Sequence, residues 1–243
     1  MRIIEKRFLR GPNLFSDTPC LMAVLDAAAS SAPAPAPGLG ARVLALLPSL
    51  PAESSARLAN LACLADAVEP VVMELQRLAG APAEFSQSLD VPRKPGVRRV
   101  VCGYRTEQVA GQALEVALAM IKTLARGEDY DLAAALEQLH ETAEDYAIGT
   151  STGAVVNAAL RRGIPALRIT DEANLFQLGW GSRQKRLQAT ITGATNSIAV
   201  GIASDKQLTK TLLEQAGVPV PGGATVTSLA DAQHVARGLR GPA

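Results

Sequence analysis

The sequence predicts an α/β protein, and three observations support this. Of the 243 residues, 48% are apolar and 19% are charged, which is enough to build a hydrophobic core. Short β-prone segments alternate with segments in which apolar residues recur at helical spacing. Aromatic residues make up only 3% of the chain and alanine is abundant, so we expect helices to provide most packing surfaces. These features favour an α/β or α+β architecture with one or two domains.

The first expected elements are two short strands, residues 3–8 and 21–25. The turn-forming sequence Arg10-Gly11-Pro12-Asn13 follows the first of them. Residues 30–40 (SSAPAPAPGLG) are rich in Pro, Ala and Gly. Because proline opposes a helix and the segment offers nothing to anchor a core, we predict a mobile surface loop there.

A helix is expected over residues 64–78, where leucine and valine recur at i, i+4, i+7, i+11 and i+14. Gly80 is placed to end this helix. Pro70 lies inside the pattern, so it should either kink the helix or mark a new first turn.

Residues 97–104 are expected to form a strand, and a long helix should begin at Thr106. A further helix is expected over residues 132–146. Gly149 then interrupts the helical pattern. We therefore predict a domain of residues 1–148 and a second one of residues 149–243.

Composition and charge exclude several function classes. The formal net charge is +1 at pH 7, so the chain has no general electrostatic attraction for nucleic acid, and stacking aromatic residues are scarce. Cys20, Cys63 and Cys102 are widely spaced, which favours reduced, mostly buried thiols and a cytoplasmic protein. No apolar run approaches the ~20 residues that a membrane span requires.

The sequence Thr150-Ser151-Thr152-Gly153 precedes a segment with helical spacing of apolar residues. Free backbone N–H groups at a helix start, beside a hydroxyl group and a glycine, can hold a carboxylate or a phosphate. Ser151, Thr152 and Gly153 are therefore candidate substrate-binding residues. The alternative is that Ser151 or Thr152 is only an N-cap.

A second candidate lies at Ser204-Asp205-Lys206-Gln207, which resembles a capping box with Ser204 as the cap. The expected helix ends at Gly217. A lysine in the first helical turn opposes the helix dipole, so Lys206 could be placed there to contact a polyphosphate. The alternative is a solvated lysine that tolerates a small penalty.

Two basic clusters accompany these sites. Arg93, Lys94, Arg98 and Arg99 surround a proline-containing turn, and the second cluster follows Gly179-Trp180-Gly181 in an expected hairpin, at Arg183, Lys185 and Arg186. Both clusters are consistent with solvated charge at turns.

Six segments spread over nearly the whole chain occur in an order known from one enzyme family. They are LRGPN at 9–13, MELQRLAG at 73–80, YRTEQVAGQALEVA at 104–117, STGAVVNAALRRGIP at 151–165, QLGWGSRQKRLQATIT at 177–192 and SIAVGIASDKQLTKTLLEQAGVPVP at 197–221. With these segments the chain resembles cyanophycin synthetase, the enzyme family that builds the aspartate–arginine storage polymer cyanophycin.

The resemblance implies an α+β N-terminal domain that holds the polymer, followed by the beginning of an ATP-grasp ligase module. In that family the module uses ATP and Mg²⁺ to phosphorylate the C-terminal carboxylate of the polymer, which aspartate then attacks. By matched position, Ser151 would grip that carboxylate and Lys206 would contact nucleotide phosphate. The full-length family enzymes are implied to be cytoplasmic homo-oligomers. For the two basic clusters, the resemblance adds an alternative to solvated charge, namely contact with the carboxylates and guanidinium groups of the polymer.

This chain departs from the family pattern in two respects. The second phosphate lysine, the Gly-rich loop, the Mg²⁺ ligands and the acyl-phosphate arginine of the family lie beyond Ala243. We therefore expect a truncated chain with an incomplete ATP-grasp module, no catalytic residue of its own and no tight binding of ATP or Mg²⁺. Some relatives also resemble metal hydrolases near the MELQ segment, but here that stretch contains no histidine. His140 is expected on a solvated helix face, and no metal site is predicted.

Two functions are compatible with these observations. The chain could be the front part of an ATP-dependent amide ligase that holds the aspartate–arginine polymer for elongation. Alternatively, it could be a non-catalytic polymer-binding or oligomerising module. A third possibility, another ATP-grasp ligase such as a glutathione synthetase relative, is disfavoured because residues 1–148 resemble the polymer enzyme.

Overall fold

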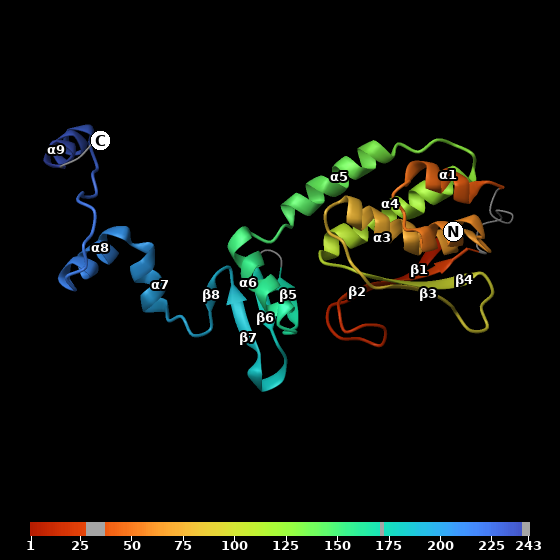
Figure 1. Ribbon diagram of the computed structural model, residues 1–243, viewed down its shortest axis with the longest axis horizontal. Coiled ribbons are helices and arrows are strands. Elements are labelled where there is room, and N and C mark those ends of the chain that lie inside the picture. Colours follow the sequence, from red (N-terminus) through yellow and green to blue (C-terminus); the bar gives the residue numbers. More distant parts are fainter. Residues whose placement is uncertain (28–36, 171–172, 240–243) are drawn as a thin grey trace.

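A computed structural model describes residues 1–27, 37–170 and 173–239. Within them, helices are combined with two antiparallel four-stranded sheets (Figure 1). This combination confirms the predicted mixed α/β class.

The first sheet and its helices come from the N-terminal part of the chain. The strand order is β1-β2-β4-β3, with every neighbouring pair antiparallel. The elements are β1 (Arg2–Leu9), β2 (Cys20–Asp26), α1 (Leu39–Leu46), α2 (Ala52–Ala59), η1 (Leu64–Ala67), α3 (Val68–Leu78), β3 (Ser86–Asp90), β4 (Val97–Gly103), α4 (Glu107–Ala125) and α5 (Leu132–Asp145). The strands and helices expected in this region are therefore present, and α1, α2 and β3 are additional.

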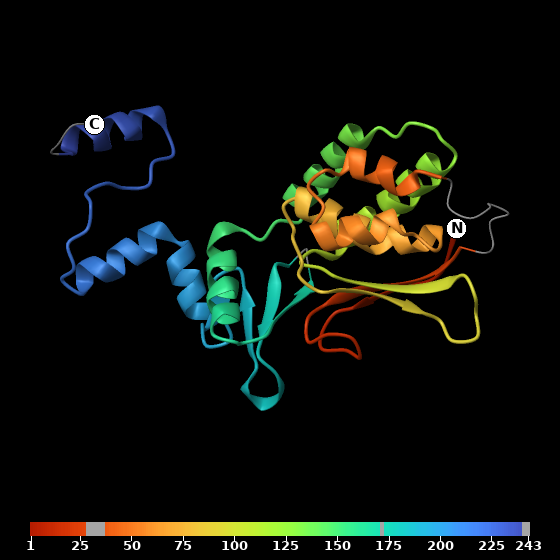
Figure 2. The ribbon, with the colours of Figure 1, turned by 45° about the vertical axis from the view of Figure 1, so that its right-hand side comes forward.

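The main core lies between this sheet and the helices. Figures 1 and 2 show α1, α3 and α4 on one side of the sheet. Leu21, Ala23 and Leu25 of β2 point to that side and pack with the apolar faces of α3 and α4. Because strand side chains alternate, Cys20 and Met22 point to the opposite side and belong to a separate small cluster with Val101. We call the side of Leu21, Ala23 and Leu25 the inner face of the sheet, and the side of Cys20 and Met22 the outer face.

The prediction of a mobile loop over residues 30–40 is wrong at its C-terminal end. Residues 30–36 lie outside the described part of the chain, but Leu39 and Gly40 are buried in the first turn of α1. The backbone of Gly40 approaches the carbonyl group of Leu58 so closely that a Cβ atom would overlap it. The glycine therefore allows close packing of α1 on α2.

Pro70 marks a new first turn and does not kink a longer helix. The predicted helix over residues 64–78 divides into the 3₁₀ turn η1 and helix α3, in which Pro70 is the third residue. As predicted, Gly80 ends α3 with a positive φ of 77°. The N–H groups of Gly80 and Ala81 bond the carbonyls of Arg77 and Gln76, which is a Schellman motif.

The second sheet follows α6 (Thr150–Arg161), and its strand order is β5-β6-β7-β8. Its elements are β5 (Ala166–Thr170), β6 (Leu175–Leu178), η2 (Gly181–Arg183), β7 (Lys185–Gln188) and β8 (Ile191–Thr192). Val156 of α6 packs against Phe176 and Leu187 of the sheet and forms a small core. The predicted hairpin after Gly179 is confirmed.

Three helices follow, α7 (Ser197–Ser204), α8 (Lys206–Gln215) and α9 (Leu229–Gly238). Both views show them extending away from the first sheet. None of the three contains a buried residue, so capping and local propensity define them more than packing does. As predicted, Gly217 follows the end of α8, again in a Schellman motif. No helix in the described part of the chain is long and apolar enough to cross a membrane.

Candidate functional site

The first turn of α6 has the geometry expected of an anion-binding helix start. Gly149 is the N-cap residue, and it has no side chain that could bond the first-turn N–H groups. The alternative interpretation, in which Ser151 or Thr152 caps the helix, is therefore wrong, because both residues lie inside the first turn. Ser151 is exposed, so its hydroxyl group and the adjacent backbone N–H can face a ligand.

Thr152 differs from Ser151 because it is buried and its hydroxyl group is occupied. Its Oγ1 donates a hydrogen bond to the Ala189 carbonyl (3.0 Å) and accepts one from Asn174 Nδ2 (3.1 Å). Asn174 and Ala189 both have positive φ, 46° and 52°, which non-glycine residues rarely adopt. The Thr152 side chain thus fixes two unusual backbone positions below α6. Only its backbone N–H is left for an anion.

Gly153 has a smaller part in the arrangement than the sequence indicates. Its N–H already bonds the Gly149 carbonyl at 2.8 Å. A Cβ atom there would make ordinary contacts with Ile148, so space does not require a glycine. The N–H of Thr150, which the sequence argument did not include, is the better partner for an anion. The position of Gly149 before the helix was the signal that could have revealed it.

The start of α8 is arranged differently. The predicted capping box with Ser204 as cap is wrong, since Ser204 is the last residue of α7 and Asp205 is the N-cap. The Asp205 carboxylate accepts the N–H groups of Gln207 (3.0 Å) and Leu208 (2.9 Å). An anionic side chain thus fills this helix start. Lys206 is exposed in the first turn, where its ammonium group can face a phosphate.

The structure brings Ser151, Thr152 and Gly153 together in one turn, but Lys206 belongs to a different helix. In both views α6 and α8 lie apart, and α8 packs against α7. Neither of the two hollows described below includes any of these four residues. The carboxylate and phosphate roles stay predictions at two separate helix starts.

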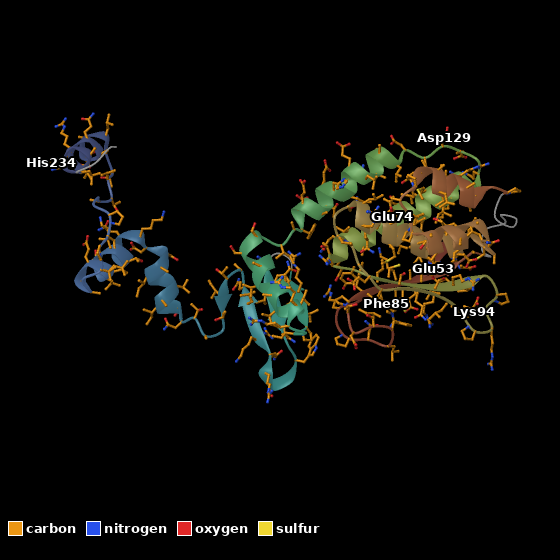
Figure 3. All side chains as sticks on the ribbon, in the orientation of Figure 1. Glu53, Glu74, Phe85, Lys94, Asp129 and His234 are labelled. Carbon is orange, nitrogen blue, oxygen red and sulfur yellow. The ribbon has the colours of Figure 1, made fainter. Side chains whose placement is uncertain are left out.

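The basic clusters separate into paired and solvated charges. Arg98 is not a solvated turn residue, because it forms ion pairs with Asp66 (2.7 Å) and with Asp90. Lys94 points away from the body of the molecule at the turn between β3 and β4 (Figure 3). In the second cluster, Arg183, Lys185 and Arg186 are all exposed on the β6–β7 hairpin.

The prediction for His140 is confirmed, since it lies on the exposed side of α5. Its Nε2 is 2.9 Å from the Leu78 carbonyl, to which it donates a hydrogen bond. An open hollow of about 580 Å³ runs along this helix and is lined by Glu137, His140, Glu141 and Glu144 among others. Among the described residues, no group of three His, Cys, Asp or Glu side chains is arranged to hold a metal ion.

Glu69 is a buried carboxylate with a structural role. It accepts hydrogen bonds from Arg57 (2.7 Å) and from the hydroxyl group of Ser86, which together anchor α3 to α2 and β3. The three cysteines are free and Cys20 and Cys102 are buried, as predicted. Burial raises the pKa of the Cys20 thiol and raises that of Cys102 well above its ordinary range, where the nearby Glu69 charge adds to the effect.

Comparison with known proteins gives consistent results along the chain. Residues 21–126 match the family model described as "Cyanophycin synthase-like N-terminal domain". The chain is 32% identical over 257 residues to the cyanophycin synthetase of Synechocystis sp. and 31% identical over 250 residues to that of Trichormus variabilis. It is also 32% identical over 252 residues to that of Geminocystis herdmanii.

These alignments cover 99%, 96% and 96% of the chain, and they span 29%, 28% and 28% of the relatives' lengths. The matched family model covers the first sheet from β2 onward together with helices α1 to α4. The second sheet and the helices that follow it lie outside that model and inside the pairwise alignments. On these similarities, residues 21–126 form a cyanophycin synthase-like N-terminal domain, and the chain as a whole is similar to a part of cyanophycin synthetases.

Proposed function

We propose that this chain holds the aspartate–arginine polymer for elongation by an ATP-dependent amide ligase. The observation that carries the proposal is the open start of α6, where no side chain caps the helix and Ser151 is exposed. A helix start of this kind favours a carboxylate through its N–H groups and its dipole. Similarity to cyanophycin synthetases supplies the candidate ligand, the terminal carboxylate of the polymer.

The proposal includes a division of labour along the chain. Residues 1–148 would form the polymer-holding domain, and residues 149–243 would form the beginning of an ATP-grasp module. The separate hydrophobic clusters support this division, since one lies among residues 1–143 and another among residues 148–187. The exposed cations of the β6–β7 hairpin lie within the second of these two ranges. Their positive charge suits the carboxylates of the polymer.

The proposal also includes a contact between this chain and the nucleotide. When bound, ATP would supply the phosphoryl group that activates the carboxylate. Lys206 is the residue that would contact its phosphates, chiefly through its ammonium group, because Asp205 occupies the N–H groups of Gln207 and Leu208. We therefore expect this chain to bind nucleotide weakly.

The test is calorimetric titration of the 243-residue chain with a short aspartate–arginine polymer. Replacement of Ser151 by alanine should weaken binding about tenfold, which corresponds to the loss of one hydrogen bond to a charged group. Ser197→Ala is the matched control, because Ser197 is also an exposed serine in the first turn of a helix. Its affinity should equal that of the unmodified chain.

Amidation of the polymer's C-terminal carboxylate gives a second arm to the experiment. The amidated polymer should bind more weakly to the unmodified chain and should be almost insensitive to Ser151→Ala. Equal affinity of Ser151→Ala and the unmodified chain for the free-carboxylate polymer would refute the proposed role of α6.

A further inference from the structure

The outer face of the first sheet contains a hollow that has no part in the proposed function. Its volume is about 390 Å³, within the ~300–1,000 Å³ usual for small-molecule sites. Met22 of β2 and Arg99 of β4 lie on this outer face. The strand register shows this, because their side chains alternate with those of the inner-face residues. Figure 3 labels Phe85 on this side of the sheet and Glu74 among the helices on the other side.

The strongest feature of the hollow is the guanidinium group of Arg99. Arg98 and Arg99 are consecutive in β4 and therefore point to opposite faces, and Arg98 pairs with two carboxylates. Among residues 1–27, 37–170 and 173–239, the Arg99 side chain has no ion-pair partner, and its buried Nε has no hydrogen-bond acceptor. A buried donor on a cation without an acceptor is costly, so an anionic ligand would be stabilised there.

The other charges in the hollow neutralise each other. Arg7 and Glu5 both line it and form an ion pair with one another. Among the described residues that line the hollow, only the guanidinium group of Arg99 is left without a counter-charge. The hollow therefore suits a ligand with one carboxylate, whose two oxygens match the planar guanidinium.

The wall of the hollow is apolar. It consists mainly of Leu9, Leu14 and Phe15, and Met22 lies on its floor. Leu14 is 98% exposed although it lines the hollow, so its side chain has apolar surface available for a ligand.

The loop that carries this wall is fixed by the side chain of Asn13. The Oδ1 atom of Asn13 accepts the N–H groups of Phe15 (2.9 Å) and Ser16 (3.1 Å), and its Nδ2 donates to the carbonyls of Gly11 and Thr18. A preformed wall lowers the entropy cost of binding.

From these features we propose that the hollow binds a small apolar carboxylate. Arg99 pairs with the carboxylate group, and the wall of Leu9, Leu14 and Phe15 covers the apolar body. The proposal does not depend on polymer binding at α6, because the two sites share no residue.

The test compares 3-phenylpropionate with its uncharged amide, 3-phenylpropanamide, by calorimetry with the complete 243-residue chain. The acid should bind at least about tenfold more tightly than the amide, as expected for a charge-assisted pair. This comparison uses the unmodified protein, so it does not depend on the folding of any variant. Equal affinities, or no binding of either compound, would overturn the proposal.

Variants locate the site. Arg99→Gln should reduce affinity for the acid about tenfold, whereas Arg99→Lys should keep part of it because the charge remains. Lys94→Gln is the matched control, since it removes the same charge from the exposed turn of the same hairpin (Figure 3). An equal loss in Lys94→Gln and Arg99→Gln would show a general charge effect and refute the site.

A tripeptide that ends in phenylalanine tests whether the carboxylate belongs to a peptide C-terminus or to a free small acid. Tighter binding of the tripeptide than of 3-phenylpropionate would identify a peptide C-terminus as the ligand, and weaker binding would identify a free acid. In both cases the ¹³C-methyl resonance of Met22 should shift on binding. An unchanged Met22 resonance would contradict the proposed location.

Discussion

At the scale of single residues, neighbouring positions in one short motif have different tasks. Ser151 faces solvent, whereas Thr152 is buried and bonds Ala189 and Asn174. Both are small hydroxyl residues, so the sequence cannot distinguish them. Their difference arises from turn residues that follow 22 and 37 positions later in the chain.

Thr152→Val tests the structural role of this hydroxyl group. Valine keeps the shape of threonine but leaves the Ala189 carbonyl and the Asn174 amide without a partner. We expect the free energy of unfolding of the second sheet to fall by about 1–3 kcal/mol, measured by urea denaturation. Thr150→Val makes the same chemical change at an exposed position and should alter stability by less than about 0.5 kcal/mol. An equal effect of the two substitutions would contradict the assignment.

Glu74 provides a prediction about pH. Its buried carboxylate accepts two hydrogen bonds from Arg77 and one from Ser49, and these lower its pKa below the ordinary value of 4.5, with Arg77 the largest cause. Because the folded-state pKa is lower than the unfolded one, the stabilisation is present above the unfolded value. It is lost as the pH falls through the folded value.

Glu74→Gln should therefore reduce stability at pH 7 by about 1–2 kcal/mol and flatten the decline of stability in acid. The measurement is the urea midpoint between pH 7 and pH 3. Glu137→Gln, at an exposed position of α5, is the control. An acid decline that is as steep in Glu74→Gln as in the unmodified chain would disprove this role for Glu74.

At the scale of elements, the positions of most helices and strands could be predicted from residues that are close together in the sequence. Gly80 and Gly217 end α3 and α8 as the sequence predicted, because a Schellman motif is defined by neighbouring residues. Helix starts were less predictable. Asp205 caps α8 in place of Ser204, since a short helix, α7, ends at Ser204.

Helix α1 was missed because its stability depends on contacts with distant residues. Leu39 follows a proline-rich segment and has no local helical pattern, yet it is buried against the main core. The contact of Gly40 with Leu58 is also invisible in the sequence. The candidate site was predictable only in part. The helix start at Gly149 is set by neighbouring residues and could be predicted, whereas the hydrogen bonds of Thr152 reach distant residues and could not.

Gly40→Ala should destabilise the protein although alanine favours helices. The new Cβ would overlap the Leu58 carbonyl, so α1 and α2 must move apart, at a cost of about 1–3 kcal/mol. Gly201→Ala in α7 is the matched control, because no atom lies near the added Cβ and helix propensity should improve by about 0.5–1 kcal/mol. Thermal denaturation followed by circular dichroism measures both. A Gly40→Ala variant that is more stable than the unmodified chain would be incompatible with the described packing.

At the scale of the whole molecule, packing is unevenly distributed along the chain. The N-terminal sheet and helices share one large core, whereas the second sheet and α6 share a core of three buried residues, Val156, Phe176 and Leu187. Helices α7 to α9 have no buried residue. Sequence periodicity indicated where helices occur but did not reveal this gradient, because burial depends on which elements meet.

Calorimetry should therefore show two thermal transitions. Phe176→Ala should abolish or lower the transition at lower temperature, because it removes most of the smaller core at a cost of about 3–5 kcal/mol. Leu114→Ala, in the larger core, should lower the temperature of the higher transition and leave the lower-temperature transition unchanged. A single transition that both substitutions shift equally would show that the chain unfolds as one cooperative unit.

One contact between loops of the two halves of the chain has a practical consequence. Trp180, after strand β6, lies where a Cβ on Gly11 would be 3.6 Å from its ring, so the β6–β7 hairpin touches the loop that follows β1. Trp180 is the single tryptophan of the chain. The indole therefore acts as a built-in fluorophore at the junction of the two halves, and its emission spectrum reports whether they stay joined without any label being attached.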